Sequence, residues 1–182
     1  MKPQSSAMVR RLASPSALLL AALLAGSAPA LAASPTTDAD FLQQAVHSES
    51  TEAQIGQLAL QKSSSAGVKK LGQMLIEDHA TSGQEATRIA NTMQVSLPMN
   101  PSADEQEDTY QSLSGLSGDA FDKAFISAVI ENSQAAIARY EAQAQSGDGE
   151  VAAYADKTLP LLEKHLRMAR MLKMRTTEHN TP

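Results

Sequence analysis

Four long stretches of the chain carry apolar residues at the three- and four-residue spacing of an amphipathic helix. Helices are predicted over residues 38–63, 66–92, 119–146 and 150–175, with a short one at 103–113 inside a polar connector. Serine- and glycine-rich breaks separate the first helix from the second and the third from the fourth. No stretch alternates as a half-buried strand does. The pattern predicts an all-α, four-helix bundle built from two helical hairpins.

Polar side chains interrupt the apolar stripes of three predicted helices. Glu52 lies at the centre of the first stripe, with Glu49 at its edge. His79 falls inside the second stripe, with Asp78 at its edge, and His165 lies near the centre of the fourth. With a rise of about 1.5 Å per residue, these positions lie at similar depths from the two hairpin turns. We expect them to share a layer in the middle of the bundle.

The burial of these polar side chains needs a compensating interaction, because an unpaired carboxylate among apolar side chains costs several kcal/mol of folding free energy. One compensation is a transition-metal ion, since carboxylates and neutral imidazoles suit iron, manganese or zinc. The other is a hydrogen-bonded Glu–His network that fixes helix register and binds nothing. The Glu-x-x-His spacing of di-iron bundles is missing, because Ile76 and Leu162 stand three residues before the histidines. The residue pattern leaves both interpretations open.

Proline and methionine add two features to the fourth predicted helix. Pro160 lies inside it and should introduce a kink or a boundary. Met168, Met171 and Met174 follow His165 at three-residue steps, and thioethers bind Cu(I). That row turns away from the core face, which favours core filling and surface exposure over a copper site.

The fourth predicted helix ends in basic residues, which complement the helix dipole. The sequence shows no broad basic field beyond them, so this end does not by itself predict an acidic partner or a membrane.

The first 32 residues have the three parts of a secretory signal peptide. Basic residues occupy the start, an apolar run covers 17–25, and the small-residue pattern Ala30-Leu31-Ala32 follows. The run is shorter than the about 20 residues of a transmembrane helix. We expect cleavage after Ala32 and a protein located in the periplasm or outside the cell.

The predicted exported chain consists of a disordered leader (33–37), the helical domain (38–175) and a flexible tail (176–182). It keeps twelve basic and twenty acidic residues, so its net charge is −8, against −5 for the whole chain. This balance argues against nucleic-acid binding, which needs a basic face. The absence of cysteine excludes disulfides, iron–sulfur clusters and a cysteine nucleophile, so any metal must be held by carboxylate and imidazole.

Catalytic motifs give no assignment. The chain has no Gly-rich phosphate loop, no G-x-S-x-G turn and no H-E-x-x-H pair. The sequence therefore does not decide whether the protein is an enzyme. It identifies no protein partner, and it is compatible with a homo-oligomer.

Several strings along the chain resemble one family in their order and spacing. They are Asp40-Phe41-Leu42, residues 52–59, residues 68–71, residues 74–79, Leu97-Pro98, Phe121-Asp122 and residues 159–166. Together they are similar to exported bacterial proteins with domain of unknown function 4142 (DUF4142), over about residues 38–174. The resemblance implies a ferritin-like helical bundle in the periplasm or outside the cell, with no established activity.

The resemblance also bears on the polar layer. The family's recurrent polar positions fall on Glu52, Asp78, His79 and His165. A further histidine is usual in the third long helix, and Ser133 stands there in this chain. A serine hydroxyl is a poor ligand for a first-row divalent ion, so the resemblance implies at most a three-ligand site with open positions.

The leading hypothesis is an exported ferritin-like bundle that binds iron, manganese or zinc for metal handling or stress protection. Glu52 would be the anionic ligand, His79 and His165 the imidazole ligands, and Glu49 or Asp78 would assist. The alternative is a non-catalytic structural or interaction bundle in which the same residues form a hydrogen-bonded core network.

Overall fold

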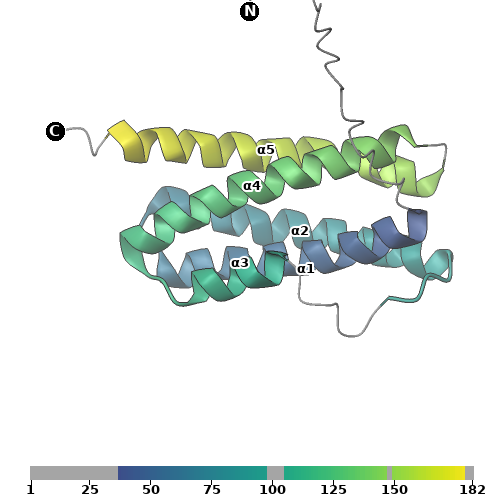
Figure 1. Cartoon of the computed structure of the whole chain (residues 1–182), viewed down its shortest axis with the longest axis horizontal. Helices are drawn as coiled ribbons and strands as arrows, with labels where there is room; N and C mark the ends of the chain where they lie inside the picture. The colour runs from purple at the N-terminus through teal and green to yellow at the C-terminus, as the bar shows by residue number, and fades with distance from the viewer. Residues whose placement is uncertain (1–36, 98–104, 147–148, 179–182) are drawn as a thin grey trace, which may run out of the picture. The chain divides into compact units, whose positions relative to one another are not determined.

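Two helical hairpins form the part of the chain that the structure, a computed structural model, describes: residues 37–97, 105–146 and 149–178. The helices there are α1 (Asp38–Lys62), α2 (Ala66–Thr92), α3 (Glu105–Ser114), α4 (Gly118–Gln145) and α5 (Glu150–Glu178) (Figure 1). α1 pairs with α2, α4 pairs with α5, and α3 contacts α1 and α4. No strand occurs within these ranges. The predicted four-helix bundle, with a short helix in its connector, is confirmed.

Some predicted segments lie outside the described residues. These are the signal peptide (1–32), leader positions 33–36, connector residues 98–104, positions 147–148, and 179–182 at the predicted tail. Within the described ranges, no helix is long and apolar enough to cross a membrane.

Helix α1 begins with a capping box. Thr37, predicted as part of the leader, is the N-cap, and its hydroxyl accepts a hydrogen bond from the Asp40 backbone N–H at 3.1 Å. The Asp40 carboxylate in turn accepts a hydrogen bond from the Thr37 backbone N–H at 3.4 Å. The reciprocal bonds satisfy N–H groups that a helix start leaves without intrahelical partners.

Helix α5 continues through Pro160, so of the two predicted effects, a kink or a boundary, the boundary is wrong and the kink stays a prediction. Proline removes the hydrogen bond to the carbonyl four residues earlier, here that of Asp156. Both residues are exposed, so water can replace the missing bond. The helix also runs to Glu178, three residues beyond the prediction.

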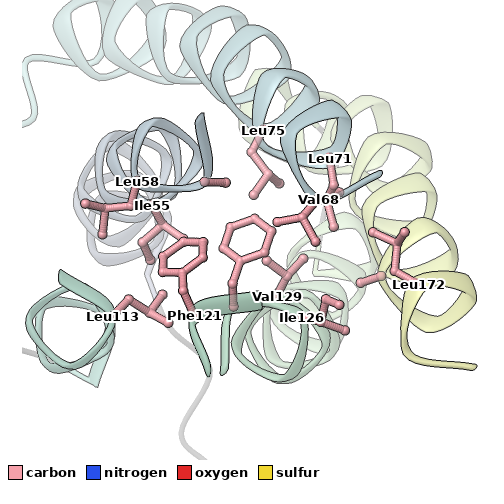
Figure 2. Packing of buried hydrophobic residues seen from close by; sticks show 13 residues of the cluster. Ile55, Leu58, Val68, Leu71, Leu75, Leu113, Phe121, Ile126, Val129 and Leu172 are labelled. Atoms are coloured by element: carbon pink, nitrogen blue, oxygen red, sulfur yellow. The ribbon is translucent and has the colours of Figure 1, made fainter. Parts of the chain in front are cut away.

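Two apolar clusters fill the bundle on either side of a polar layer. The first joins residues 55–59 of α1, 68–75 of α2, 121–129 of α4 and 169–172 of α5, together with Leu113 of α3 (Figure 2). The second joins residues 41–45, 86–90 and 151–155 with Tyr140 and Leu162. Most of the buried polar positions in the described ranges lie between these segments, with at least one on every long helix, namely Ser48, Glu49, Thr51, Glu52, His79, Ser82, Ser133, Thr158 and His165. The layer therefore lies in the middle of the bundle.

Candidate functional site

The carboxylate of Glu49, on α1, is the centre of the polar layer, and side chains from the other three long helices bond to it. His79 Nδ1 from α2 lies 2.7 Å from Oε2, and Ser82 Oγ donates to Oε1 at 3.0 Å. Tyr140 from α4 donates to Oε1 at 2.7 Å, and Tyr154 from α5 does so at 3.2 Å. With Glu49 only 3% exposed, these bonds replace the water that the carboxylate loses on folding.

Burial and hydrogen bonding have opposite effects on the pKa values of Glu49 and His79. Burial would raise the pKa of Glu49, but the bond from His79 and those from Tyr140 and Ser82 outweigh it and hold the pKa below its ordinary value. Burial would likewise lower the pKa of His79, but Glu49 outweighs it and the pKa is raised. His79 therefore donates its Nδ1–H to an ionised Glu49.

A second carboxylate–imidazole pair lies beside the first. His165 Nε2 is 2.8 Å from Asp78 Oδ2, and the exposed Lys164 donates to the same oxygen at 3.2 Å. Burial, together with the charge of His79, lowers the pKa of His165 to about 4. At neutral pH the imidazole is therefore uncharged.

The tautomer of His165 follows from this contact. The pKa of Asp78 is lowered: burial would raise it, but the bonds from His165 and Lys164 outweigh that effect. An ionised Asp78 needs a donor, so the single ring proton lies on Nε2. Nδ1 then carries a lone pair, and it is buried with no hydrogen-bond partner among the described residues. The centres of the His79 and His165 rings are 5.0 Å apart.

Glu52 occupies the side of the layer next to α4. Asn132 donates to its Oε1 at 2.7 Å, and burial raises the pKa of this carboxyl. A cavity of about 20 Å³ lies here, lined by Glu52, His79, Ser133 and Arg139 among others. That volume suffices for one water-sized guest. Ser133, which stands where the family usually has a further histidine, is buried here.

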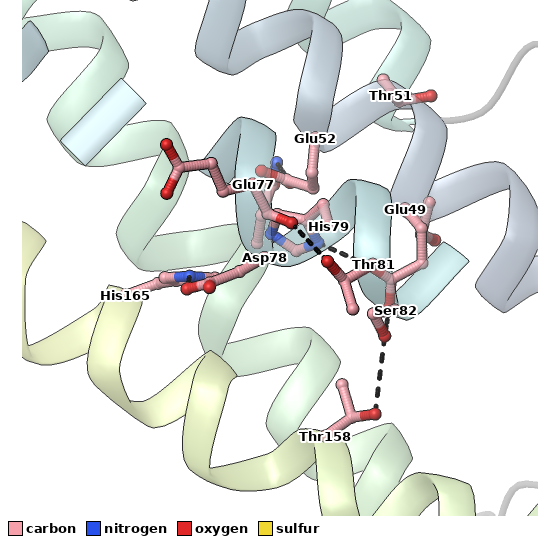
Figure 3. A network of polar contacts seen from close by, with 12 residues as sticks. Glu49, Thr51, Glu52, Glu77, Asp78, His79, Thr81, Ser82, Thr158 and His165 are labelled. Carbon is pink, nitrogen blue, oxygen red and sulfur yellow. Dashed lines mark hydrogen bonds and ion pairs between the residues drawn. The ribbon is translucent and has the colours of Figure 1, made fainter. Parts of the chain in front are cut away.

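The five predicted site residues thus lie around His79 (Figure 3). They are organised as two carboxylate–histidine pairs and a separate buried glutamate. His79 bonds to Glu49, which was expected only to assist. Across the described ranges, no three His, Asp or Glu side chains already converge on one point as metal ligands would.

Sequence reasoning did not identify the polar partners of Glu49 and Glu52. Ser82, Tyr140 and Tyr154 fall on the apolar stripes of their helices, so their spacing alone indicates core positions. A buried tyrosine hydroxyl needs a hydrogen-bond partner, and that was the available signal. Asn132 gave no comparable signal, since it lies beside the stripe.

An open groove of about 500 Å³ reaches the layer from outside, between α1 and α2. Glu49 and His79 lie in its lining with the small residues Ala53, Ala80 and Gly83. A Cβ on Gly83 would lie 3.1 Å from Glu49 Cβ, so the glycine lets α2 pass close to Glu49 at this point. The groove brings solvent close to the buried pair.

The methionine row does not belong to this layer. Met168 is half-buried against the first apolar cluster. Met171 and Met174 are 44% and 58% exposed. Their exposure agrees with the expected turn of the row away from the core.

Solved structures with this fold belong to another uncharacterised group. A DUF305 fragment from Deinococcus radiodurans superposes with a TM-score of 0.65 at 17% identity, covering 78% of this chain and 99% of that one. A DUF305 protein from Streptomyces coelicolor, named as a candidate secreted protein, gives 0.64 at 14% identity, covering 79% and 96%. At these identities the likeness is one of fold alone.

Comparison with curated proteins finds no match. The sequence profile described as Domain of unknown function (DUF4142) matches residues 23–172, which is most of the chain and includes all five residues of the predicted site. The resemblance noted in the sequence is therefore confirmed, and the chain belongs to the DUF4142 family.

Proposed function

We propose that this protein is an exported bundle that binds one divalent transition-metal ion through His79, His165 and Glu52. The buried, unpartnered Nδ1 of His165 carries the proposal. A buried polar group without a partner costs about 1–3 kcal/mol, which a bound ion would offset. Export is supported by the predicted signal peptide and by the name of the Streptomyces coelicolor neighbour. Holding an ion outside the cytoplasm would serve metal handling or stress protection.

The two carboxylate–histidine pairs support this function chemically. Metal-bound histidines commonly donate their other ring N–H to a carboxylate, which orients the ring. Glu49 and Asp78 would orient His79 and His165 in this way, leaving His79 Nε2 and His165 Nδ1 for the ion. Two imidazoles on one ion at about 2.1 Å per bond have ring centres about 5 Å apart. The observed separation of 5.0 Å fits that requirement.

The third ligand requires a local movement. Glu52 bonds to Asn132 in the structure, so its carboxylate would have to rotate toward His79. Binding would also displace the Nε2 proton of His79, because metal ligation needs neutral imidazole. Oxygen and imidazole nitrogen ligands suit iron, manganese or zinc. With Ser133 in place of a further histidine, remaining positions would be taken by water.

Metal titration tests the proposal directly. Residues 33–182, purified without a histidine tag, are expected to bind Zn(II), Mn(II) or Fe(II) at one ion per chain in calorimetry and metal analysis. A Glu52→Ala/His165→Ala double variant should bind at least about 100-fold more weakly. Glu77→Ala is the matched control, because Glu77 is exposed on α2 two residues before His79. Substoichiometric metal in the wild type, without any stability response to added ions, would refute the proposal.

The stability of a Glu52→Gln variant gives a second, metal-free test. Because burial raises the pKa of Glu52, ionising this carboxyl in the core costs folding free energy. Glutamine can still accept from Asn132, so the variant should gain about 0.5–2 kcal/mol of unfolding free energy while losing metal affinity. Urea denaturation of both proteins without metal measures the difference. A loss of stability would instead indicate that the carboxylate is structural.

A hydrogen-bonded structural layer is the second candidate, and the coordination of Glu49 favours it. Its carboxylate is bonded from α2, α4 and α5, which fixes the relative register of the helices. With this role alone, Glu52 and His165 variants would lose stability and no ion would bind. The two experiments above distinguish the candidates.

A further inference from the structure

The C-terminal half of α5 presents cations and apolar side chains on one exposed face. The basic–methionine face consists of Arg167, Arg170, Met171, Met174 and Arg175, which are all exposed. At 100° per residue these positions fall on one side of the helix. Met171 and Met174 are among the few large apolar side chains exposed in the described ranges.

The charge of this segment differs from that of the rest of the protein. Residues 164–175 contain five of the fifteen Lys and Arg residues and no Asp or Glu, in a chain with twenty acidic residues. The helix dipole accounts for cations in the last turn. It does not account for Arg167 and Arg170, because α5 continues to Glu178. Arg167 pairs with the exposed Glu163 at 3.3 Å, a contact that solvent weakens.

The side of α5 opposite the basic–methionine face packs into the bundle. Ala169 and Leu172 are buried in the first apolar cluster, so the helix is anchored from within the bundle. The basic–methionine face is therefore formed before any partner arrives. Binding through it needs no folding step and loses little conformational entropy.

We propose that the basic–methionine face docks on an anionic lipid surface. Clusters of Lys and Arg on an amphipathic helix attract anionic headgroups, and apolar side chains among them enter the headgroup boundary. An acidic protein would use the cations but leaves the two exposed methionines unexplained. The acidic remainder of the chain would repel the same membrane, so only this face can approach it. The proposal does not depend on metal binding.

Vesicle flotation tests the proposal with the chain from Ala33 onward, which holds the compact unit of residues 34–182. Wild type should bind vesicles of equimolar phosphatidylglycerol and phosphatidylcholine, and salt should weaken binding. It should not bind phosphatidylcholine alone. Arg170→Glu/Arg175→Glu should lower the bound-to-free ratio at least about tenfold. Met171→Ser/Met174→Ser should lower it several-fold with the cations intact.

Lys69→Glu/Lys70→Glu is the control, because it makes the same charge change on exposed positions of α2. It should retain most of the binding, and circular dichroism should show native helix content in every variant. The proposal is overturned if wild type binds neither vesicle, binds both equally, or loses as much binding in the control. Binding to polyglutamate without binding to vesicles would also overturn it, and would indicate an acidic protein partner.

Discussion

Replacing Glu49 with alanine is expected to lower the free energy of unfolding by about 3–5 kcal/mol. The change removes the acceptor for His79, Ser82 and Tyr140 and leaves these donors buried around a cavity. The raised pKa of His79 would lose its main cause, so burial would favour the uncharged ring. Urea denaturation of the metal-free protein, followed by circular dichroism, measures the loss.

Two further variants separate charge from packing. Glu49→Gln keeps the size and one acceptor oxygen, so it should lose less, about 1–3 kcal/mol. Glu141→Ala removes an exposed carboxylate on α4 and should change stability by less than about 0.5 kcal/mol. A Glu49→Ala variant as stable as Glu141→Ala would contradict the central role of this carboxylate.

The Glu49 charge should also make stability depend on pH. The pKa of Glu49 is lowered, so its contribution is present above its ordinary value of 4.5 and is lost as pH falls through the folded pKa. The pKa of His79 is raised, so its contribution is present below 6.5 and is lost as pH rises through the folded pKa. The stability difference between wild type and Glu49→Gln should therefore be largest between these two values.

Gly72→Leu is expected to destabilise the bundle by about 3 kcal/mol. A Cβ on Gly72 would lie 2.6 Å from Ala59 Cβ and 2.8 Å from the Gly56 carbonyl oxygen, so α1 and α2 would have to separate. The gain in helix propensity, about 1 kcal/mol, is smaller than this cost. Thermal denaturation measures the loss. Ala80→Leu, an exposed position of the same helix, is the control and should be near neutral.

The positions of the helices could be read from the sequence because helix periodicity and capping are local. Residues 66–92 were predicted as a helix and α2 has those bounds. The sequence did not decide between a kink and a boundary at Pro160, because the effect of proline depends on whether the freed carbonyl of Asp156 meets water or core. That carbonyl belongs to an exposed residue, and exposure is a property of the packed bundle.

The residues that lie on the core side of the polar layer could also be predicted, but the contacts between them could not. Periodicity identifies which side of a helix Glu49 and Glu52 occupy. It does not determine which of them meets His79, because that depends on axial shifts between helices smaller than one turn. For the same reason the sequence did not predict the contacts of Tyr140 with Glu49 and of Asn132 with Glu52, which join positions about 80 to 90 residues apart.

By itself, the sequence determined an all-helical chain of two hairpins with carboxylates and histidines on its core side. These features follow from the order of the residues and the periodicity of the α-helix, which are both local. The tertiary structure decided that side chains of α2, α4 and α5 bond to Glu49 of α1, that Asp78 bonds to His165, and that Nδ1 of His165 is buried with no partner among the described residues. Those facts depend on helix rotation and offset, which are set by the packing of both apolar clusters at once.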